Sequence, residues 1–272
     1  MPEYQASQVL ENSNSTLEEL LNALEDMAVQ YGYISAMAGH GLRENVDTDL
    51  VRTLCIIKII KLRIHKKNNY PKNPMATKKL LNVDHFDQND NDEDLFGPGW
   101  RQCCMTSNAM AANYILKKHG LESLSEAAKR LGYSEGESYY GRILNTYGDS
   151  ADHNANTKAL AELGLESYFS TSLGIDHAIA SIDADMPMPA GFIYKKDGHI
   201  VCITGYDQNT QELIVNDPYG IREGGQDFYR TIGGYSGKND HYTFDLIRDV
   251  WANPTDGWGR VFTKVNGKAT GL

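Results

Sequence analysis

Two adjacent cysteines, Cys103 and Cys104, stand where the sequence has the clearest potential for chemistry. They follow a Gly/Pro-rich break, and small and apolar side chains then recur at three- and four-residue steps as far as Ile115. This spacing predicts a buried helix that begins at Cys103 and ends before Gly120. A thiol in the first turn of a helix ionises readily, because unpaired N–H groups and the helix dipole favour the nucleophilic thiolate. The pattern fits equally well two small buried residues, since free cysteine is among the most buried types.

A cysteine nucleophile needs a base beside it, and His199 is the histidine in the most suitable context. A turn-forming Lys-Asp-Gly at 196–198 precedes it, and an apolar run at 200–203 follows. This order predicts a histidine held at the rim of a sheet, where a base is useful. An exposed rim histidine without a catalytic role is the more frequent case for any single histidine.

Asp217 is the candidate for the group that orients this base. The apolar run 212–216 is expected to pair with the run 199–206 through a turn at 207–210. Hairpin strands are antiparallel, so the end of the second strand returns to the level of His199. A carboxylate there can accept the ring N–H and stabilise the imidazolium. The alternative is that Asp217 only opens a β-turn, which the following Pro-Tyr-Gly fits equally well.

Gln88 lies in the loop before the cysteines, and its side-chain amide could donate to an oxyanion together with a backbone N–H. The loop continues as an acidic run at 87–94, which resembles a calcium loop in composition only. An EF-hand needs Gly at its sixth and Glu at its twelfth position, where this run has Asp92 and Pro98. A solvated loop is therefore favoured, and neither a metal nor a cofactor is expected.

The elements that must position these residues form two groups. Helices are expected at 123–131, from Asp152 or Asn154 to 163, and at 175–183, and residues 133–152 are predicted to be irregular. Strands are expected at 190–194, 199–206, 212–216 and 259–265. Helices followed by strands predict an α+β domain, in which a helical half packs on an antiparallel meander.

The first 75 residues differ from the rest. A capping-box sequence opens a predicted helix that ends near residue 32, and the isoleucine-rich segment 53–64 is a helix or a strand. The basic, proline-containing run 65–74 is linker-like. We therefore predict an N-terminal helical extension with its linker over 1–75 and a main domain over 76–272. The apolar segment should be covered by the domain or by a protein partner.

The composition is that of an ordinary globular protein with a formal charge of −10 and a pI near 5.3. This charge argues against nucleic-acid binding and against an anionic membrane surface. The longest apolar run is too short and too charged to span a bilayer, so membrane insertion is not expected. No signal peptide is recognisable, which predicts a cytoplasmic protein or one that is released or virion-associated by a non-secretory route. Four cysteines in 272 residues predict reduced thiols.

Four segments together resemble one family. They are FDQND at 86–90, CCMTSNAM at 103–110, GHIVCITGY at 198–206 and VNDPYG at 215–220. In this order they resemble papain-like cysteine peptidases related to the double-glycine leader peptidases that process bacteriocins. The resemblance covers about residues 80–265 and implies the papain-like fold.

Position by position, the resemblance implies Cys103 as nucleophile, His199 as base and then acid, Asp217 as orienting group and Gln88 as oxyanion donor. The sequence departs from the family at Cys104, where a glycine or small polar residue is usual. The long Gln88-to-Cys103 spacing keeps Gln102 as an alternative donor.

The expected activity is hydrolysis of an amide bond in a peptide or a peptidoglycan-type substrate, as in an endolysin, and a transferase with the same chemistry is also open. The first alternative is a non-catalytic peptide- or glycan-binding module on the same fold. The second is a docking protein whose arm, residues 1–75, joins a larger, virion-like assembly.

Overall fold

The computed structural model describes residues 77–272, apart from 92, 195–196, 223–228 and 252–256. The predictions for the N-terminal extension, its linker and the boundary near residue 75 lie outside the described residues. Lys196, in the turn expected at 196–198, also lies outside them.

The helices expected from the sequence are present. They are α5 (Cys103–Lys118), α6 (Leu124–Leu131), α8 (His153–Glu162) and α9 (Ile175–Asp183). A capping box formed by Ser123 and Glu126 begins α6, and Gly132 ends it with φ of 83°. The side chain of Asp152, rather than Asn154, caps α8. Short helices not expected from the sequence are α4 (Glu93–Phe96) and α10 (Phe244–Val250).

The prediction of irregular structure over 133–152 is wrong, because helix α7 (Gly136–Asn145) occupies its middle. Glycine, serine and tyrosine have modest helix propensity, which explains the prediction. Tertiary packing decides the outcome: Tyr140 and Leu144 are fully buried, and the Tyr140 hydroxyl donates to Asn156 Oδ1 at 2.9 Å.

The main sheet of the described residues has eight antiparallel strands in the order β10-β9-β3-β4-β5-β8, with β1 paired to β4 and β2 paired to β9. Their bounds are β1 Lys78–Leu80, β2 Leu165–Leu173, β3 Met188–Tyr194, β4 Asp197–Asp207, β5 Glu212–Asn216, β8 Asp240–Thr243, β9 Gly257–Val265 and β10 Lys268–Ala269. Strands β6 (Gly220–Ile221) and β7 (Thr231–Ile232) form a small separate ladder.

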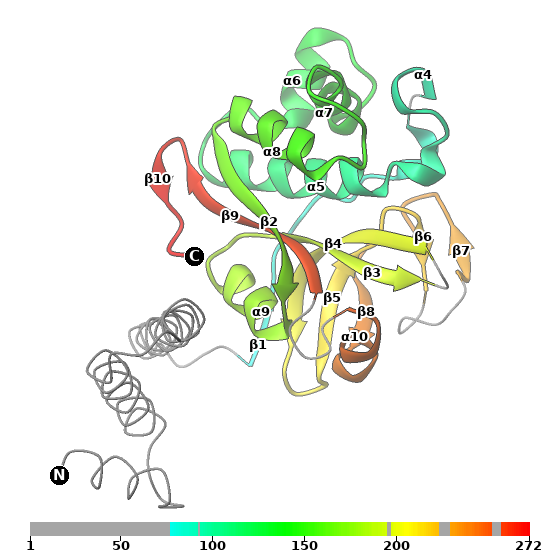
Figure 1. Ribbon diagram of the computed structural model, residues 1–272, viewed down its shortest axis with the longest axis vertical. Helices are drawn as coiled ribbons and strands as arrows, with labels where there is room; N and C mark the ends of the chain where they lie inside the picture. Colours follow the sequence, from blue (N-terminus) through cyan, green and yellow to red (C-terminus); the bar gives the residue numbers. More distant parts are fainter. Residues whose placement is uncertain (1–76, 92, 195–196, 223–228, 252–256) are drawn as a thin grey trace, which may run out of the picture. The chain divides into compact units, whose positions relative to one another are not determined.

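The two halves meet along α5. Helices α5 to α8 lie together on one side, and the sheet with α9 and α10 lies on the other (Figure 1). One apolar core joins them: Ala109, Met110 and Ile115 of α5 are fully buried, as are Val201 and Ile203 of β4. The α+β architecture predicted from the sequence, with helices packed on an antiparallel sheet, is therefore confirmed.

A β-bulge in β4 determines that His199 and Asp217 lie on the same face of the sheet. Gly205 pairs with Ile214, but Ile203 pairs with Val215, so one residue of β4 is looped out between them. Continuing this register places Asp217 opposite Val201, whose side chain points to the same face as that of His199. Without the extra residue, Asp217 would stand opposite Cys202 and face the other side.

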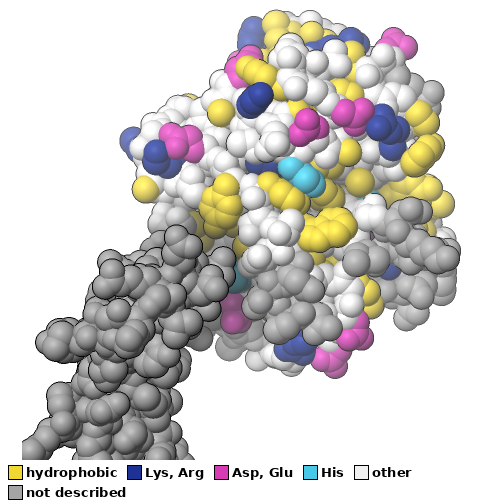
Figure 2. Space-filling view, in the orientation of Figure 1, with side chains coloured by type: hydrophobic (Ala, Val, Ile, Leu, Met, Phe, Trp, Pro, Cys, Tyr) yellow, Lys and Arg dark blue, Asp and Glu magenta, His cyan; other side chains and the backbone are white. Residues whose placement is uncertain are grey.

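Among the described residues, no helix combines the length and apolar character that crossing a bilayer requires. On the face drawn in Figure 2, basic and acidic side chains are interspersed, and hydrophobic side chains gather beside a histidine.

Candidate active site

Cys103 is the first residue of α5 and is partly exposed, whereas the rest of the helix from Cys104 to Asn113 is buried. One turn further along the same face, the Ser107 hydroxyl donates to the carbonyl oxygen of Ile200 at 2.9 Å. This bond joins α5 to β4 beside His199. The start of the helix is thereby fixed against the strand that carries the candidate base.

His199 lies between Cys103 and Asp217. Its Nε2 is 2.7 Å from Asp217 Oδ1, and its ring is hydrogen-bonded to the Cys103 thiol. Because Nε2 is engaged by the carboxylate, Nδ1 is the ring nitrogen left for the sulfur. The structure therefore brings together, in one line, the three residues that the sequence indicated separately.

The Asp217 carboxylate is fully buried and accepts several hydrogen bonds besides that of His199. The Tyr219 backbone N–H donates to Oδ1 at 2.9 Å. The hydroxyls of Tyr229 and Tyr242 donate to Oδ2 at 3.0 and 2.9 Å. A buried carboxylate that is satisfied in this way stays ionised and holds its orientation.

The charges of Cys103, His199 and Asp217 stabilise one another. Burial opposes ionisation of Cys103, but the hydrogen bond and the positive charge of His199 outweigh it and lower the pKa of the thiol. Burial also disfavours the imidazolium, yet the Asp217 carboxylate and the Cys103 thiol raise the pKa of His199 to about 10. Desolvation likewise works against the Asp217 carboxylate, and the charge of His199 holds its pKa below the usual value. Both shifts act in the direction of a thiolate–imidazolium pair.

Cys104 points into the helical half, away from this row. Its sulfur is 3.8 Å from His153 Nδ1, and the amides of Asn108 and Asn156 donate to it at 3.6 and 3.8 Å. Burial, followed by the neighbouring charge of Cys103, raises the pKa of Cys104 to about 12. The three described cysteines, Cys103, Cys104 and Cys202, are all free thiols, as the sequence predicted.

Gln88 is fully buried in a 3₁₀ turn (Gln88–Asp90), and its Nε2 donates to the carbonyl oxygen of Gly99 at 2.9 Å. Gly99 opens a second 3₁₀ turn (Gly99–Arg101), which leads directly into α5. Gln88 is thus held at the approach to Cys103 despite the long spacing in sequence. The alternative donor, Gln102, is also buried, and its Nε2 donates back to Gly97 O at 2.7 Å.

Neither the two tyrosines nor Arg222 behind them could be predicted from local sequence patterns. The Arg222 guanidinium is almost fully buried and lies over both rings, 5.7 Å from that of Tyr229 and 5.5 Å from that of Tyr242. Tyr242 belongs to β8, which was not predicted, so no local pattern could place it beside Asp217. A tyrosine in an edge strand carries no signal of its own.

Known proteins resemble this chain. The profile of the Peptidase_C39 like family matches residues 80–243, which is more than half of the chain. A similar solved structure is xylellain, a cysteine protease from Xylella fastidiosa, with 14% sequence identity and a TM-score of 0.38. That match covers 70% of this chain and 87% of xylellain. No curated protein matches the chain.

Proposed function

The chain belongs to the Peptidase_C39 like family and is a cysteine peptidase, and on this premise we propose that it cleaves an amide bond through Cys103, His199 and Asp217. The observation that carries the proposal is the row formed by a partly exposed thiol, a buried imidazole and a buried carboxylate. Cys103 is the nucleophile, His199 the acid and base, and Asp217 the orienting group.

In the first half-reaction the Cys103 thiolate attacks the carbonyl carbon of the scissile bond. The His199 imidazolium then gives its proton to the leaving nitrogen, and the C–N bond breaks to leave a thioester on Cys103. In the second half-reaction His199 removes a proton from water and the hydroxide attacks the thioester carbon. The C–S bond then breaks, the carboxylic acid product leaves, and the Cys103 thiolate and His199 imidazolium are restored. Asp217 stays ionised throughout and holds the ring in the tautomer that the reaction needs.

The oxyanion of each tetrahedral intermediate would be met by the backbone N–H at the start of α5 and by Gln88. A side-chain amide has two N–H groups, and the bond to Gly99 uses one of them. This arrangement supports Gln88 over Gln102, whose amide is directed to Gly97 and closes the preceding loop.

We propose a peptide amide as the scissile bond, in a polypeptide or in a peptidoglycan stem. Trp100 is 65% exposed and stands three residues before Cys103. An exposed indole so close to the nucleophile provides an apolar surface for a substrate side chain.

The test is to trap the acyl-enzyme and to identify the bond that is cleaved. Full-length protein is incubated with an activated aryl ester and examined by intact and peptide mass spectrometry. It is then given a peptide library and, separately, purified peptidoglycan. The expected result is an acyl adduct on Cys103 and cleavage products from one substrate class, with both lost in His199→Ala.

Two results would contradict the proposal. An adduct on Cys104 would move the nucleophile to the other thiol. Binding of peptides or glycan strands without any adduct or cleavage would favour a non-catalytic module.

A further inference from the structure

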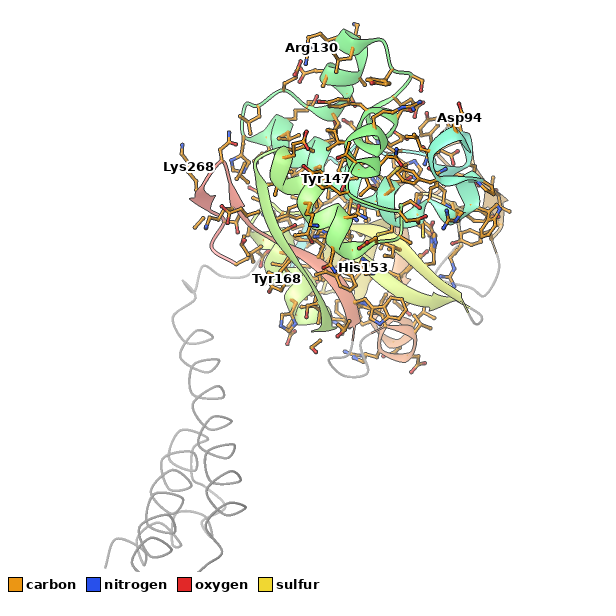
Figure 3. The ribbon with its side chains drawn as sticks, turned by 45° about the horizontal axis from the view of Figure 1, so that its top comes forward. Asp94, Arg130, Tyr147, His153, Tyr168 and Lys268 are labelled. Carbon is orange, nitrogen blue, oxygen red and sulfur yellow. The ribbon has the colours of Figure 1, made fainter. Side chains whose placement is uncertain are left out.

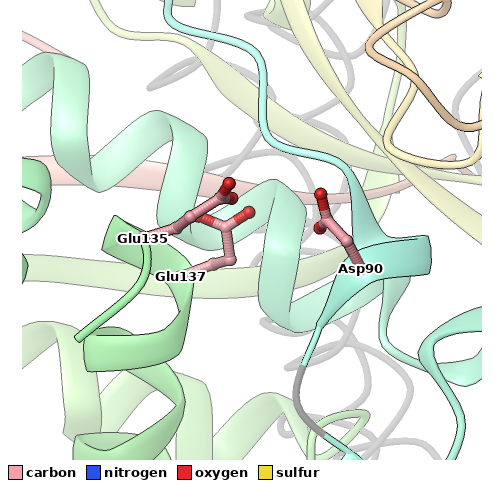
Figure 4. A group of neighbouring side chains, drawn as sticks. All are labelled: Asp90, Glu135 and Glu137. Atoms are coloured by element: carbon pink, nitrogen blue, oxygen red, sulfur yellow. The ribbon is translucent and has the colours of Figure 1, made fainter.

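Three carboxylates lie close together outside the row formed by Cys103, His199 and Asp217. They stand between the Gln88–Asp90 turn and the start of α7. They belong to Asp90, Glu135 and Glu137, and one oxygen of each lies within 4.8 Å of the others. Figure 4 shows the three side chains directed toward a common space. Asp90 is exposed, Glu135 is partly exposed and Glu137 is buried. Oxygens at such separations are close enough to share one cation.

Glu137 is the unusual member of this cluster. Its side chain is fully buried, and no positively charged or neutral donor side chain among the described residues satisfies either carboxylate oxygen. Buried carboxyl groups are normally hydrogen-bonded or paired with a positive charge. Glu135, in contrast, accepts a hydrogen bond from the Tyr235 hydroxyl at 2.8 Å. A group without a partner that points into two further carboxylates indicates that something neutralises the cluster.

The pKa values of the cluster also indicate that its negative charge must be neutralised. Burial, with the nearby carboxylates, raises the pKa of Glu137 to about 10 and that of Asp90 to about 6. The cluster therefore takes up either protons or a cation at neutral pH. The exposed side of Asp90 leaves a hydrated ion a route to the site.

We propose that Asp90, Glu135 and Glu137 bind a hard divalent cation, and that Ca²⁺ fits them best. All three ligands are carboxylate oxygens, which hard cations prefer, and within the described part of the chain no soft or nitrogen donor joins the cluster. Ca²⁺ accepts irregular geometry and completes its coordination with water, whereas Mg²⁺ demands a near-ideal octahedron. The ligands come from segments about 45 residues apart, so this site is unrelated to an EF-hand loop.

Such an ion would join the turn that carries Gln88 to the helical half. Asp90 belongs to the same 3₁₀ turn as Gln88, and Glu137 lies in the first turn of α7. Helix α7 packs closely on α5: a Cβ added at Gly141 would be 3.1 Å from the sulfur of Met105. The cation would thus fix the loop before the nucleophile against the helix that carries it.

Binding is tested on the full-length protein after removal of metals with EDTA. Ca²⁺, Mg²⁺ and Mn²⁺ are titrated separately by calorimetry and by thermal unfolding. Ca²⁺ at a hundred times its Kd is expected to raise Tm by about 5–10 °C. Glu137→Gln should abolish this rise and should itself raise Tm in EDTA, because it removes a buried, unpaired acid.

Asp176→Asn is the matched control, since Asp176 is an exposed carboxylate in the first turn of α9. It should keep the full Ca²⁺ response. If Glu137→Gln does not fold, Asp90→Asn changes only an exposed ligand and should weaken Ca²⁺ binding at least tenfold. Cys103→Ser should bind Ca²⁺ like the wild type, so failure of the proposed peptidase mechanism would leave this result unchanged.

The proposal is overturned if no cation changes Tm or releases heat, because protons alone then neutralise the cluster. It is equally overturned if Glu137→Gln and Asp90→Asn respond like the wild type.

Discussion

Helix α5 begins with two cysteines, and each of them has a histidine beside it. Cys103 meets His199, which is backed by the Asp217 carboxylate. The Cys104 thiol contacts His153, and the buried guanidinium of Arg260 lies close enough to His153 to act on its charge. The two thiols are neighbours in sequence and in the same first turn of the helix. Their surroundings nevertheless move their pKa values in opposite directions.

The group behind each histidine explains much of the difference. A carboxylate stabilises the imidazolium and, through it, the thiolate, so His199 and Cys103 can both be charged. Burial and the positive charge of Arg260 lower the pKa of His153 and so disfavour its imidazolium form. Its ring stacks on Phe169 with centroids 3.5 Å apart, and Figure 3 shows it at the start of α8. A cysteine beside a histidine is therefore not enough to lower the pKa of the thiol.

The largest effect is expected from comparing the two thiols directly. Cys103→Ala should lower kcat/KM at least about 10³-fold, because the covalent step loses its nucleophile. Cys104→Ala should retain most of the activity of the folded protein while losing some stability, since it removes a buried sulfur. Steady-state kinetics and thermal unfolding of both variants check this. Equal losses of activity in the two variants would show that Cys104 matters as much as Cys103 for the reaction.

Asp217→Asn should have the next largest effect, a loss in kcat of about 10²-fold or more, because a neutral amide no longer stabilises the imidazolium. The pH profile gives the sharper test. The pKa of His199 is raised by Asp217, so the alkaline limb of the wild-type profile should lie well above pH 6.5. In the variant this limb should move to lower pH. An unchanged alkaline limb would contradict the role given to the carboxylate.

A smaller effect is expected when one hydrogen bond to the carboxylate is removed. Tyr242→Phe should lower the free energy of unfolding by about 1.5–3 kcal/mol, as for a bond to a charged group, and should reduce kcat less than about tenfold. Tyr206→Phe is the matched control, because its hydroxyl donates to Asp183 Oδ1 at 2.7 Å, outside the catalytic row. It should change stability without changing kcat. Urea unfolding and kinetics of both variants separate the two outcomes.

The smallest effect should come from the second histidine. His153→Gln is expected to leave kcat/KM within about twofold of the wild type, because its ring touches no reacting group. The same substitution at His199 should remove nearly all activity. A comparable loss from both would show that the Cys104 side takes part in the reaction.

Local patterns predicted the elements that carry the catalytic row. The bounds of α5, α9 and β5 follow from apolar periodicity, caps and turn residues, which act over short distances in sequence. The family resemblance is confirmed by the profile match over residues 80–243. The roles assigned to single residues stay predictions.

Features that depend on distant contacts could not be read from the sequence. The extra residue in β4, which turns Asp217 to the face of His199, is Thr204. The adjacent Gly205 is compatible with a bulge but does not show in which direction the register shifts. Strand β2, paired with β9, alternates apolar and polar residues weakly and was not predicted. Burial, rather than residue type, raises the pKa of Cys104, and burial is set by helices folded over it.

The most direct test of the account is the pH dependence of alkylation of both thiols in the same molecule. Native protein is labelled with iodoacetamide across the pH range, and fragment spectra assign the label to Cys103 or Cys104. We predict rapid labelling of Cys103 with a midpoint well below the ~8.5 of a free thiol, and protection of Cys104. His199→Ala should abolish the low midpoint, and His153→Ala should not. Labelling of Cys104 first, or an ordinary midpoint for Cys103, would contradict the account.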